Sequence, residues 1–371
     1  MLLLHMGDSR NTLNALLFIP DISGFTEFVH FTEIKHSKHI ISELLEVLLD
    51  ANIMDLQLAE IEGDALFFYK EQNGVNISEL EEQIKQMYIA FHTHLKRYEY
   101  ERICQCGACS SAYNLSLKFV SHYGEIDFIK VKETLKPYGS SVIQAHRLLK
   151  NEIPINEYAL YTDKVSQIDK LETAMKASFD FGNIVFKYQA LEVFKSELPY
   201  VPPIPNEVPK HKLFTFTKTL EIPILDLYET ISNFDYRLLW VKGVDQLDYQ
   251  KDQINKKGIK HKCLIDRSKE VSQTTVTKET GPNQYVYGES TTEVPFMKRF
   301  NVYYVLEETK RGSTQLIAEC YADFKPLGVL MKPILVKKLK NNIEEAINEL
   351  ILLFKSGFSL NNQISENENN Q

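Results

Sequence analysis

The sequence predicts an α+β fold in two domains, and three observations support this prediction. Helical patterns alternate with hairpin-forming strands over residues 1–195. Five prolines lie within residues 196–210, and beyond them several strand-like segments precede one long amphipathic helix. Because hairpins rather than strand–helix–strand units join the strands of the first domain, we expect an α/β sandwich with antiparallel pairing, not a doubly wound parallel sheet.

The first domain, residues 1–195, mixes helical periodicity with short apolar runs. Ala15–Ile19 is an apolar run ended by Pro20, which is typical of a buried strand. Glu62-Gly63-Asp64 separates two strand-like runs and predicts the turn of a hairpin. The other expected elements are helices at Ser37–Leu49, Ile77–Tyr98 and Ser140–Leu149, and strands at Gln57–Ile61, Ala65–Tyr69, Leu115–Tyr123 and Ile126–Val131.

The proline-rich segment at residues 196–210 cannot be a helix or a central strand, because proline lacks a backbone donor and fixes φ. We expect a semi-rigid linker there. The second domain, residues 211–357, is predicted to be a curved antiparallel sheet around a long helix near Val329–Phe354, and a polar tail at residues 358–371 is expected to be disordered. The helix residues expected to face the sheet are Ile334, Leu339, Ile343, Ile347 and Leu350.

Composition excludes several classes of protein. The 371 residues are 44% hydrophobic and 25% charged, unlike collagenous or largely disordered chains. The net charge is −8, and residues 1–198 carry 19 basic against 28 acidic side chains, so nucleic acid is not an expected partner. No window of 18 apolar residues predicts a membrane span. With five cysteines and no export signal, we expect a cytoplasmic protein with reduced thiols.

Two aspartates are placed where a divalent cation could bind. Asp21 ends the first predicted strand, just before Gly24 and a helix start, and Asp64 lies in the hairpin turn about forty residues later. If the hairpin pairs beside that strand, the two carboxylates converge near backbone amides that favour phosphate, as phosphoryl chemistry requires. The alternative is that both aspartates only form turns or cap helices.

The motifs over residues 13–195 resemble those of class III nucleotidyl cyclases. They are Asp21-Ile-Ser-Gly-Phe-Thr26, Glu62-Gly-Asp64, His122-Tyr-Gly-Glu125 and the run from Tyr138 to Leu148. The resemblance implies a ferredoxin-like catalytic fold and a homodimer with sites at the subunit interface. It also implies Mg²⁺ or Mn²⁺ held by Asp21, Asp64 and the Ile22 carbonyl, with Arg147 stabilising the pentacoordinate phosphate and Lys187 binding the triphosphate of a nucleoside triphosphate.

Other positions depart from the cyclase pattern. Ile143 stands where the family has the asparagine that orients the ribose, and the positions that read the base are Glu60 and Lys136. We therefore expect a signalling or sensing protein whose cyclase-like domain binds metal and nucleotide but turns over little or not at all. The alternatives are an active cyclase that forms a cyclic nucleotide from ATP or GTP, and a structural dimerisation module without a ligand.

Three cysteines, Cys104, Cys106 and Cys109, lie within six residues and could meet one Zn²⁺. The fourth ligand that zinc requires is expected from His122, His92 or His94, which are near in sequence. The alternative is three reduced thiols packed around a loop. The whole N-terminal region, with this cluster, resembles an uncharacterised bacterial family of cyclase-like proteins, DUF2652.

The second domain resembles the START/Bet v1-like (SRPBCC) superfamily in its helix-grip pattern and in the segment Leu239–Gly243. The resemblance implies a cavity that holds an apolar small molecule or lipid. Its candidate lining residues are Trp240, Tyr285, Tyr287, Tyr303 and Tyr304, although such aromatics are more often part of a core.

Overall fold

The structure, a computed structural model, describes residues 13–31, 34–165, 174–179, 182–251, 253–265, 267, 269–279, 281 and 283–360. Most of residues 13–201 form a first unit, and the chain from Pro202 onward belongs to a second. The expected disordered tail lies outside the described residues from position 361 on. Residues 198–209, all of them described, contain neither helix nor strand.

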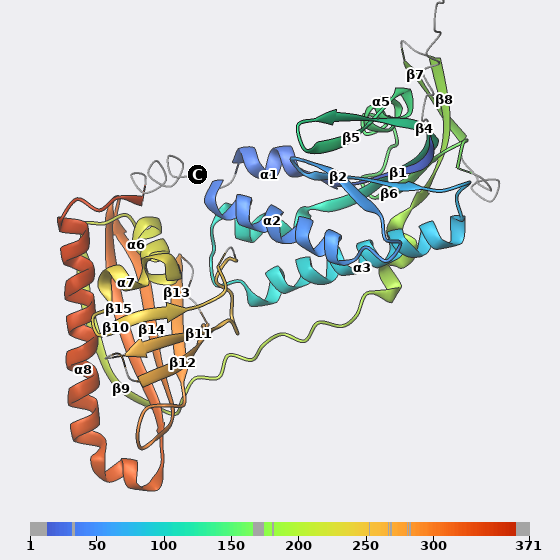
Figure 1. Ribbon diagram of the computed structural model, residues 1–371. Coiled ribbons are helices and arrows are strands. Elements are labelled where there is room, and N and C mark those ends of the chain that lie inside the picture. The colour runs from blue at the N-terminus through green and yellow to red at the C-terminus, as the bar shows by residue number, and fades with distance from the viewer. Residues whose placement is uncertain are drawn as a thin grey trace, which may run out of the picture. The chain divides into compact units, whose positions relative to one another are not determined.

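The first unit contains an eight-stranded mixed sheet in the order β2-β3-β1-β4-β6-β8-β7, with β5 paired to β4 (Figure 1). β4 and β6 are parallel, and the other neighbouring strands are antiparallel. The strands are β1 (Leu13–Ser23), β2 (Gln57–Glu62), β3 (Ala65–Glu71), β4 (Ser116–Val131), β5 (Thr134–Tyr138), β6 (Tyr158–Thr162), β7 (Ala174–Phe179) and β8 (Gly182–Ala190). The predicted α+β class is thus confirmed.

Helices cover both faces of this sheet (Figure 1). On one face α5 packs its Ala145 among Ala15, Leu17 and Ile19 of β1, the central strand that is buried on both sides. On the other face lie α2 and α3, whose buried residues recur every three or four positions, as an amphipathic helix requires. The helices are α1 (Phe25–Phe31), α2 (Ile34–Asp50), α3 (Ile77–Glu101), α4 (Gly107–Ser111) and α5 (Ser140–Arg147), with 3₁₀ turns at Ala112–Asn114 and Leu191–Glu197.

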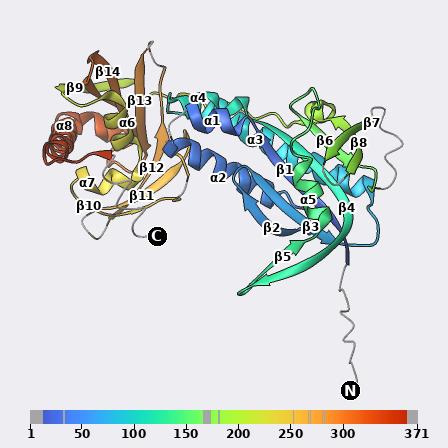
Figure 2. The same ribbon diagram turned by 90° about the horizontal axis from the view of Figure 1, so that it is seen from above.

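The two strands expected at Leu115–Tyr123 and Ile126–Val131 are one continuous strand, β4. Gly124 lies in the gap between the two predicted ranges. In the structure this glycine instead allows a close approach, because a Cβ there would lie 2.3 Å from the Ser141 hydroxyl at the start of α5. The far end of β4 pairs with β5, and Figure 2 shows this hairpin extending past the neighbouring strands.

The second unit contains a seven-stranded antiparallel sheet in the order β10-β11-β12-β13-β14-β15-β9. The strands are β9 (His211–Leu220), β10 (Val244–Asp248), β11 (Lys260–Ile265), β12 (Lys269–Val276), β13 (Gln284–Thr291), β14 (Met297–Lys310) and β15 (Ser313–Phe324). The helices are α6 (Ile224–Ser232), α7 (Arg237–Trp240) and α8 (Pro326–Lys355), with a 3₁₀ turn at Phe234–Tyr236.

The long helix α8 packs on the sheet differently from the prediction. Ile347 and Leu350 are fully buried, as expected of sheet-facing residues. Ile334 was expected to face the sheet as well, but 63% of its surface is exposed. Ala346, Ile347 and Leu350, three of the four buried residues of the helix, lie in its C-terminal half, and the fourth is Gly328 near its start. The same apolar periodicity therefore continues through turns in which Ile334 is exposed.

Candidate functional site

The clearest candidate site lies where β1 and the β2–β3 turn meet. Asp21 pairs with Ala65 across β1 and β3, and the Ile22 N–H donates to the Asp64 carbonyl at 3.1 Å, which holds the turn against β1. Gly63 has φ +65°, a conformation that glycine adopts without strain, and this makes the turn possible. Two carboxyl groups that are far apart in sequence are thereby brought into contact.

Burial and like charge dominate the electrostatics of this pair, although one lysine lies beside it. Burial and the nearby negative charge of Asp21, in that order, raise the pKa of the Asp64 carboxyl to about 6. Asp21 is itself buried, with 8% of its surface exposed. Lys118 lies opposite Asp21 in the β1–β4 register, and its Nζ is 3.2 Å from the Asp21 Oδ2. The sequence reading missed Lys118, because only the strand register brings it to the carboxylates.

The two residues expected to read a base are joined to each other. Lys136 Nζ on β5 lies 2.8 Å from Glu60 Oε1 on β2, and both side chains are more than 40% exposed. At this exposure the ion pair contributes little to stability, typically below about 1 kcal/mol. It neutralises both charges, however, and makes each less available to a base.

Arg147 and Lys187 lie on two different elements, α5 and β8. Arg147 is on the exposed face of α5, four residues and one helical turn from Ile143, which is 50% exposed. Lys187 is on β8, three strands from β1 in the sheet order. Phe186 packs on the side of α5, so strand alternation directs Lys187 to the opposite face of the sheet from Asp21.

The cysteine cluster is completed by a residue that the sequence reading did not consider. The donor atoms of His36, Cys104, Cys106 and Cys109 all lie within 4.8 Å of one another. The Cys109 Sγ is 3.4 Å from the His36 Nδ1, and all three cysteines are buried. This is a set of four soft and borderline donors that could hold a metal ion such as zinc.

The fourth ligands expected from the sequence are therefore wrong. The His92 Nε2 lies 2.7 Å from the Glu157 carboxylate, and the His94 Nε2 lies 2.9 Å from that of Glu43. His122 is fully buried beside the Thr162 hydroxyl, and burial lowers its pKa to about 4. Nearness in sequence was misleading, because α2 carries His36 to the side of α4 from about seventy positions upstream.

Comparison with known proteins places the first part of the chain in a family. Residues 41–158 match the model of a family described as "Protein of unknown function (DUF2652)". The chain is also 36% identical, over 180 residues, to the "Uncharacterized protein Rv2561/Rv2562" of Mycobacterium tuberculosis, covering 47% of this chain and 80% of that protein. This chain belongs to the DUF2652 family.

The first part is also similar to solved cyclase structures. A bacterial light-regulated adenylyl cyclase matches with a TM-score of 0.35 and 13% identity, over 49% of this chain and 91% of that one. The adenylyl cyclase CyaB from P. aeruginosa gives 0.34 and 14%, over 48% and 94%. The guanylate cyclase domain of RhGC from Catenaria anguillulae, solved with GTP, gives 0.35 and 15%, over 48% and 97%. At these scores the likenesses say nothing of this chain's activity.

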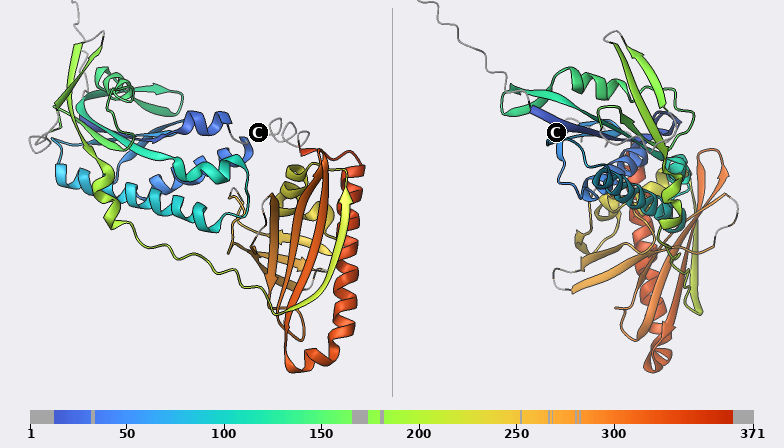
Figure 3. Two further views of the ribbon diagram at one scale, coloured as in Figure 1. Left: turned by 180° about the vertical axis from the view of Figure 1, so that it is seen from behind. Right: turned by 90° about the vertical axis from the view of Figure 1, so that its right-hand side faces the viewer.

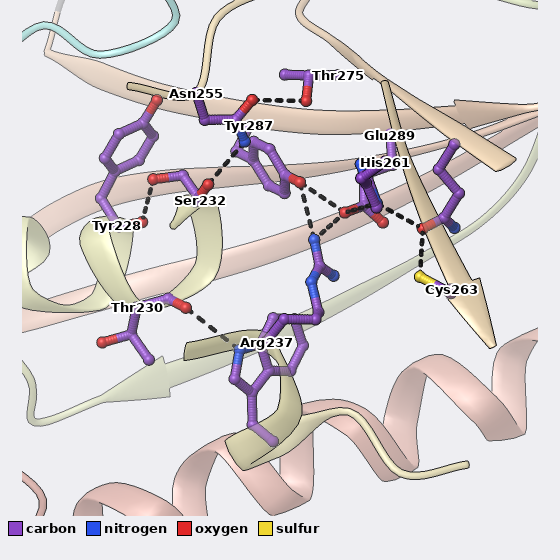
Figure 4. A network of polar contacts seen from close by, with 12 residues as sticks. Tyr228, Thr230, Ser232, Arg237, Asn255, His261, Cys263, Thr275, Tyr287 and Glu289 are labelled. Atoms are coloured by element: carbon purple, nitrogen blue, oxygen red, sulfur yellow. Dashed lines mark hydrogen bonds and ion pairs between the residues drawn. The ribbon is translucent and has the colours of Figure 1, made fainter. Parts of the chain in front are cut away.

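The interior of the second unit is polar beside α7 (Figure 4). The Arg237 guanidinium forms an ion pair with Glu289 and donates to the Tyr287 hydroxyl at 2.8 Å, and that hydroxyl donates to Glu289 at 2.5 Å. The His261 Nε2 lies 3.6 Å from the same carboxylate. Burial and the charge of Arg237 lower the pKa of His261 to about 3, so its ring is neutral at neutral pH.

The expected pocket aromatics divide into two groups. Trp240, Tyr287, Tyr303 and Tyr304 are buried side chains of the core. Tyr285 instead lines a pocket of about 670 Å³ together with Pro223, Ile224 and Leu225 at the start of α6. In the part of the chain that the structure describes, every helix is too short or too polar to cross a bilayer.

Proposed function

We propose that the first unit binds a divalent cation through Asp21 and Asp64 and, through this cation, the phosphates of a nucleoside triphosphate. The observation that carries the proposal is the contact between the carboxyl group of Asp21 on β1 and that of Asp64 in the β2–β3 turn, whose pKa is raised to about 6. The two groups repel each other, and Lys118 beside Asp21 does not return the pKa of Asp64 to its ordinary value, so a proton or a cation between the carboxyl groups is favoured. Because their donors are oxygen atoms, Mg²⁺ or Mn²⁺ suits them better than a soft metal.

The geometry favours binding over rapid turnover. Ile143 presents hydrocarbon on the exposed face of α5, at the position where the cyclase resemblance implies a ribose-orienting amide. The Glu60–Lys136 ion pair occupies the positions implied to read the base. An active cyclase is the second candidate, and it would need Lys187 from a second copy of the chain, because in this chain Lys187 is on the opposite face of the sheet from Asp21.

Calorimetric titration of the full chain with ATP or GTP and Mn²⁺ tests the proposal. We expect saturable binding that requires the metal and weakens by at least about tenfold in Asp21→Asn, since a lost ligand weakens metal binding by at least as much as a lost supporting contact. Asp163→Asn is the matched control, because Asp163 is an exposed turn residue after β6. Equal binding by the wild type and Asp21→Asn would contradict the proposal.

We further propose that His36, Cys104, Cys106 and Cys109 hold one Zn²⁺ ion as a structural site. Ligand sulfurs of a tetrahedral zinc lie about 3.8 Å apart, from a Zn–S distance of about 2.3 Å. The four donors already lie within 4.8 Å of one another, so small shifts close the shell. A closed shell of four protein ligands leaves no open position for chemistry and is typical of structural zinc.

For the second unit, we propose that the pocket beside Tyr285 holds a small molecule or lipid whose apolar part lies against Pro223, Ile224 and Leu225. The rest of the lining is largely polar and consists of Gln105, Asp226, Asn283, Glu308 and Arg311, with Gly312. Native mass spectrometry of the purified full chain tests both the zinc site and the pocket ligand. We expect about one zinc per chain, lost in His36→Ala and kept in Cys263→Ala, and a co-purified small molecule. Zinc below about 0.1 equivalent would leave only packed thiols, and a chain mass without an organic adduct would count against the ligand.

A further inference from the structure

The N-terminal half of α8 carries apolar side chains that the fold leaves in solvent. Leu327, Val329, Leu330 and Ile334 are each more than 60% exposed, and Leu330 reaches 79%. Phe296, in the turn between β13 and β14, lies beside the start of the helix and is 41% exposed. We call these five residues the apolar tip. Single exposed leucines are ordinary, but a group of this kind on one element marks a contact surface.

The position of the apolar tip is fixed by the fold. The Lys325 N–H donates to the Phe296 carbonyl at 2.9 Å, and Gly328 packs so closely there that a Cβ would come within 2.0 Å of the same oxygen. Pro333 removes one backbone hydrogen bond within the helix, and the first turns of α8 bend away from the rest (Figure 3). The tip is therefore a built feature and not a frayed helix end.

The same segment is strongly basic. Residues 324–343 contain five lysines and no acidic residue, although the whole chain is acidic. Lys325, Lys332, Lys337, Lys338 and Lys340 are all exposed. The helix thus begins with exposed apolar side chains, and lysines lie next to them in sequence and in the turns that follow. This combination matches the interface of an anionic bilayer, where hydrocarbon meets negative headgroups.

We propose that the apolar tip docks the second unit on the surface of an anionic lipid bilayer. A second copy of this chain fits less well, because a symmetric contact would bring the five lysines of each copy together. A small apolar ligand fits less well too, since the tip residues are exposed and none of them lines the pocket beside Tyr285. The helix lies on the membrane and does not cross it.

Vesicle co-sedimentation of the full chain tests the proposal. The probes are vesicles of phosphatidylcholine alone and of phosphatidylcholine with phosphatidylglycerol at 3:1. We expect at least tenfold tighter binding to the anionic vesicles, with binding that falls as salt is raised. Leu330→Glu should weaken it at least tenfold, and the double change Lys337→Glu and Lys338→Glu should remove the preference for anionic lipid.

Leu352→Glu is the matched control, because Leu352 is 55% exposed on the C-terminal half of the same helix. It should bind vesicles like the wild type. Equal binding to both vesicle types, or no effect of Leu330→Glu, overturns the proposal. A dimer in sedimentation velocity that Leu330→Glu dissociates would also overturn it, since the tip would then be an interface between copies. Unchanged melting temperatures of the variants exclude unfolding as the cause.

Discussion

Asp64 is a carboxyl group whose affinity for a proton depends on its surroundings in the folded chain. Its pKa in the folded chain is about 6, against an ordinary value of 3.8. The folded chain thus holds this proton more tightly than the unfolded chain, so the stability it contributes is complete below pH 3.8 and is lost as the pH rises through 6. A divalent cation replaces the proton, and we expect it to stabilise the first unit most above pH 6.

His261 has the opposite shift. It is buried with a pKa of about 3, against 6.5 when unfolded, so the unfolded chain binds the proton more tightly between these values. The native state of the second unit therefore loses stability as the pH falls below 6.5. At pH 5 the loss from this one ring is about 2 kcal/mol, from about 1.4 kcal/mol per pH unit.

Denaturant unfolding of the wild type and His261→Gln at pH 7 and pH 5 checks this prediction. Glutamine keeps a hydrogen-bonding group but cannot take up a proton, so the variant should lose about 2 kcal/mol less than the wild type between the two pH values. The difference isolates His261 from the other groups that titrate in this range. If both proteins lose the same stability, the ring is not held neutral.

At the scale of elements, the candidate site was predictable where local sequence determines the geometry. The glycine turn that carries Asp64 is a short-range signal and formed as expected, whereas the strand expected to end before Asp21 runs on to Ser23. Lys118 and His36 were missed, because strand register and helix packing bring them to their sites over long separations in sequence. For the same reason, the sequence alone did not show that Lys187 lies on the face of the sheet opposite to Asp21, because this depends on where β8 pairs in the sheet.

The exposed face of helix α5 bears on the rate of catalytic turnover. Ile143 and Arg147 share its exposed face, so a partner bound there would meet hydrocarbon beside the guanidinium. We expect negligible cyclase activity on ATP or GTP from the wild type. One well-placed polar group is commonly worth about 10²–10³ in rate, so Ile143→Asn should raise any residual activity in that direction.

Product formation measured by chromatography with Mn²⁺ checks this prediction. Val193→Asn, at a residue that is 55% exposed in the 3₁₀ turn Leu191–Glu197, is the control for a surface asparagine and should change nothing. A wild-type rate typical of cyclases would favour the active-enzyme alternative. An Ile143→Asn variant no faster than the wild type would show that more than this one group is missing.

At the scale of the whole molecule, the α+β class and the two-part organisation follow from hairpins, prolines and a long helix. The domain limits at residues 195, 210 and 357 remain our proposal, as does the homodimer that the cyclase resemblance implies. The long helix also shows where periodicity misleads. The apolar repeat of α8 predicts one buried face, whereas its buried residues other than Gly328 all lie in the C-terminal half.

The central claim is that Asp21 and Asp64 hold a metal to which a nucleotide binds. Anomalous diffraction from crystals grown with Mn²⁺ and a nucleoside triphosphate tests it most directly. We expect a manganese peak within about 2–2.5 Å of carboxylate oxygens of both residues, in contact with phosphate oxygens. Ordered nucleotide with manganese elsewhere, or an Asp21–Asp64 pair without an anomalous peak at saturating Mn²⁺, would contradict it.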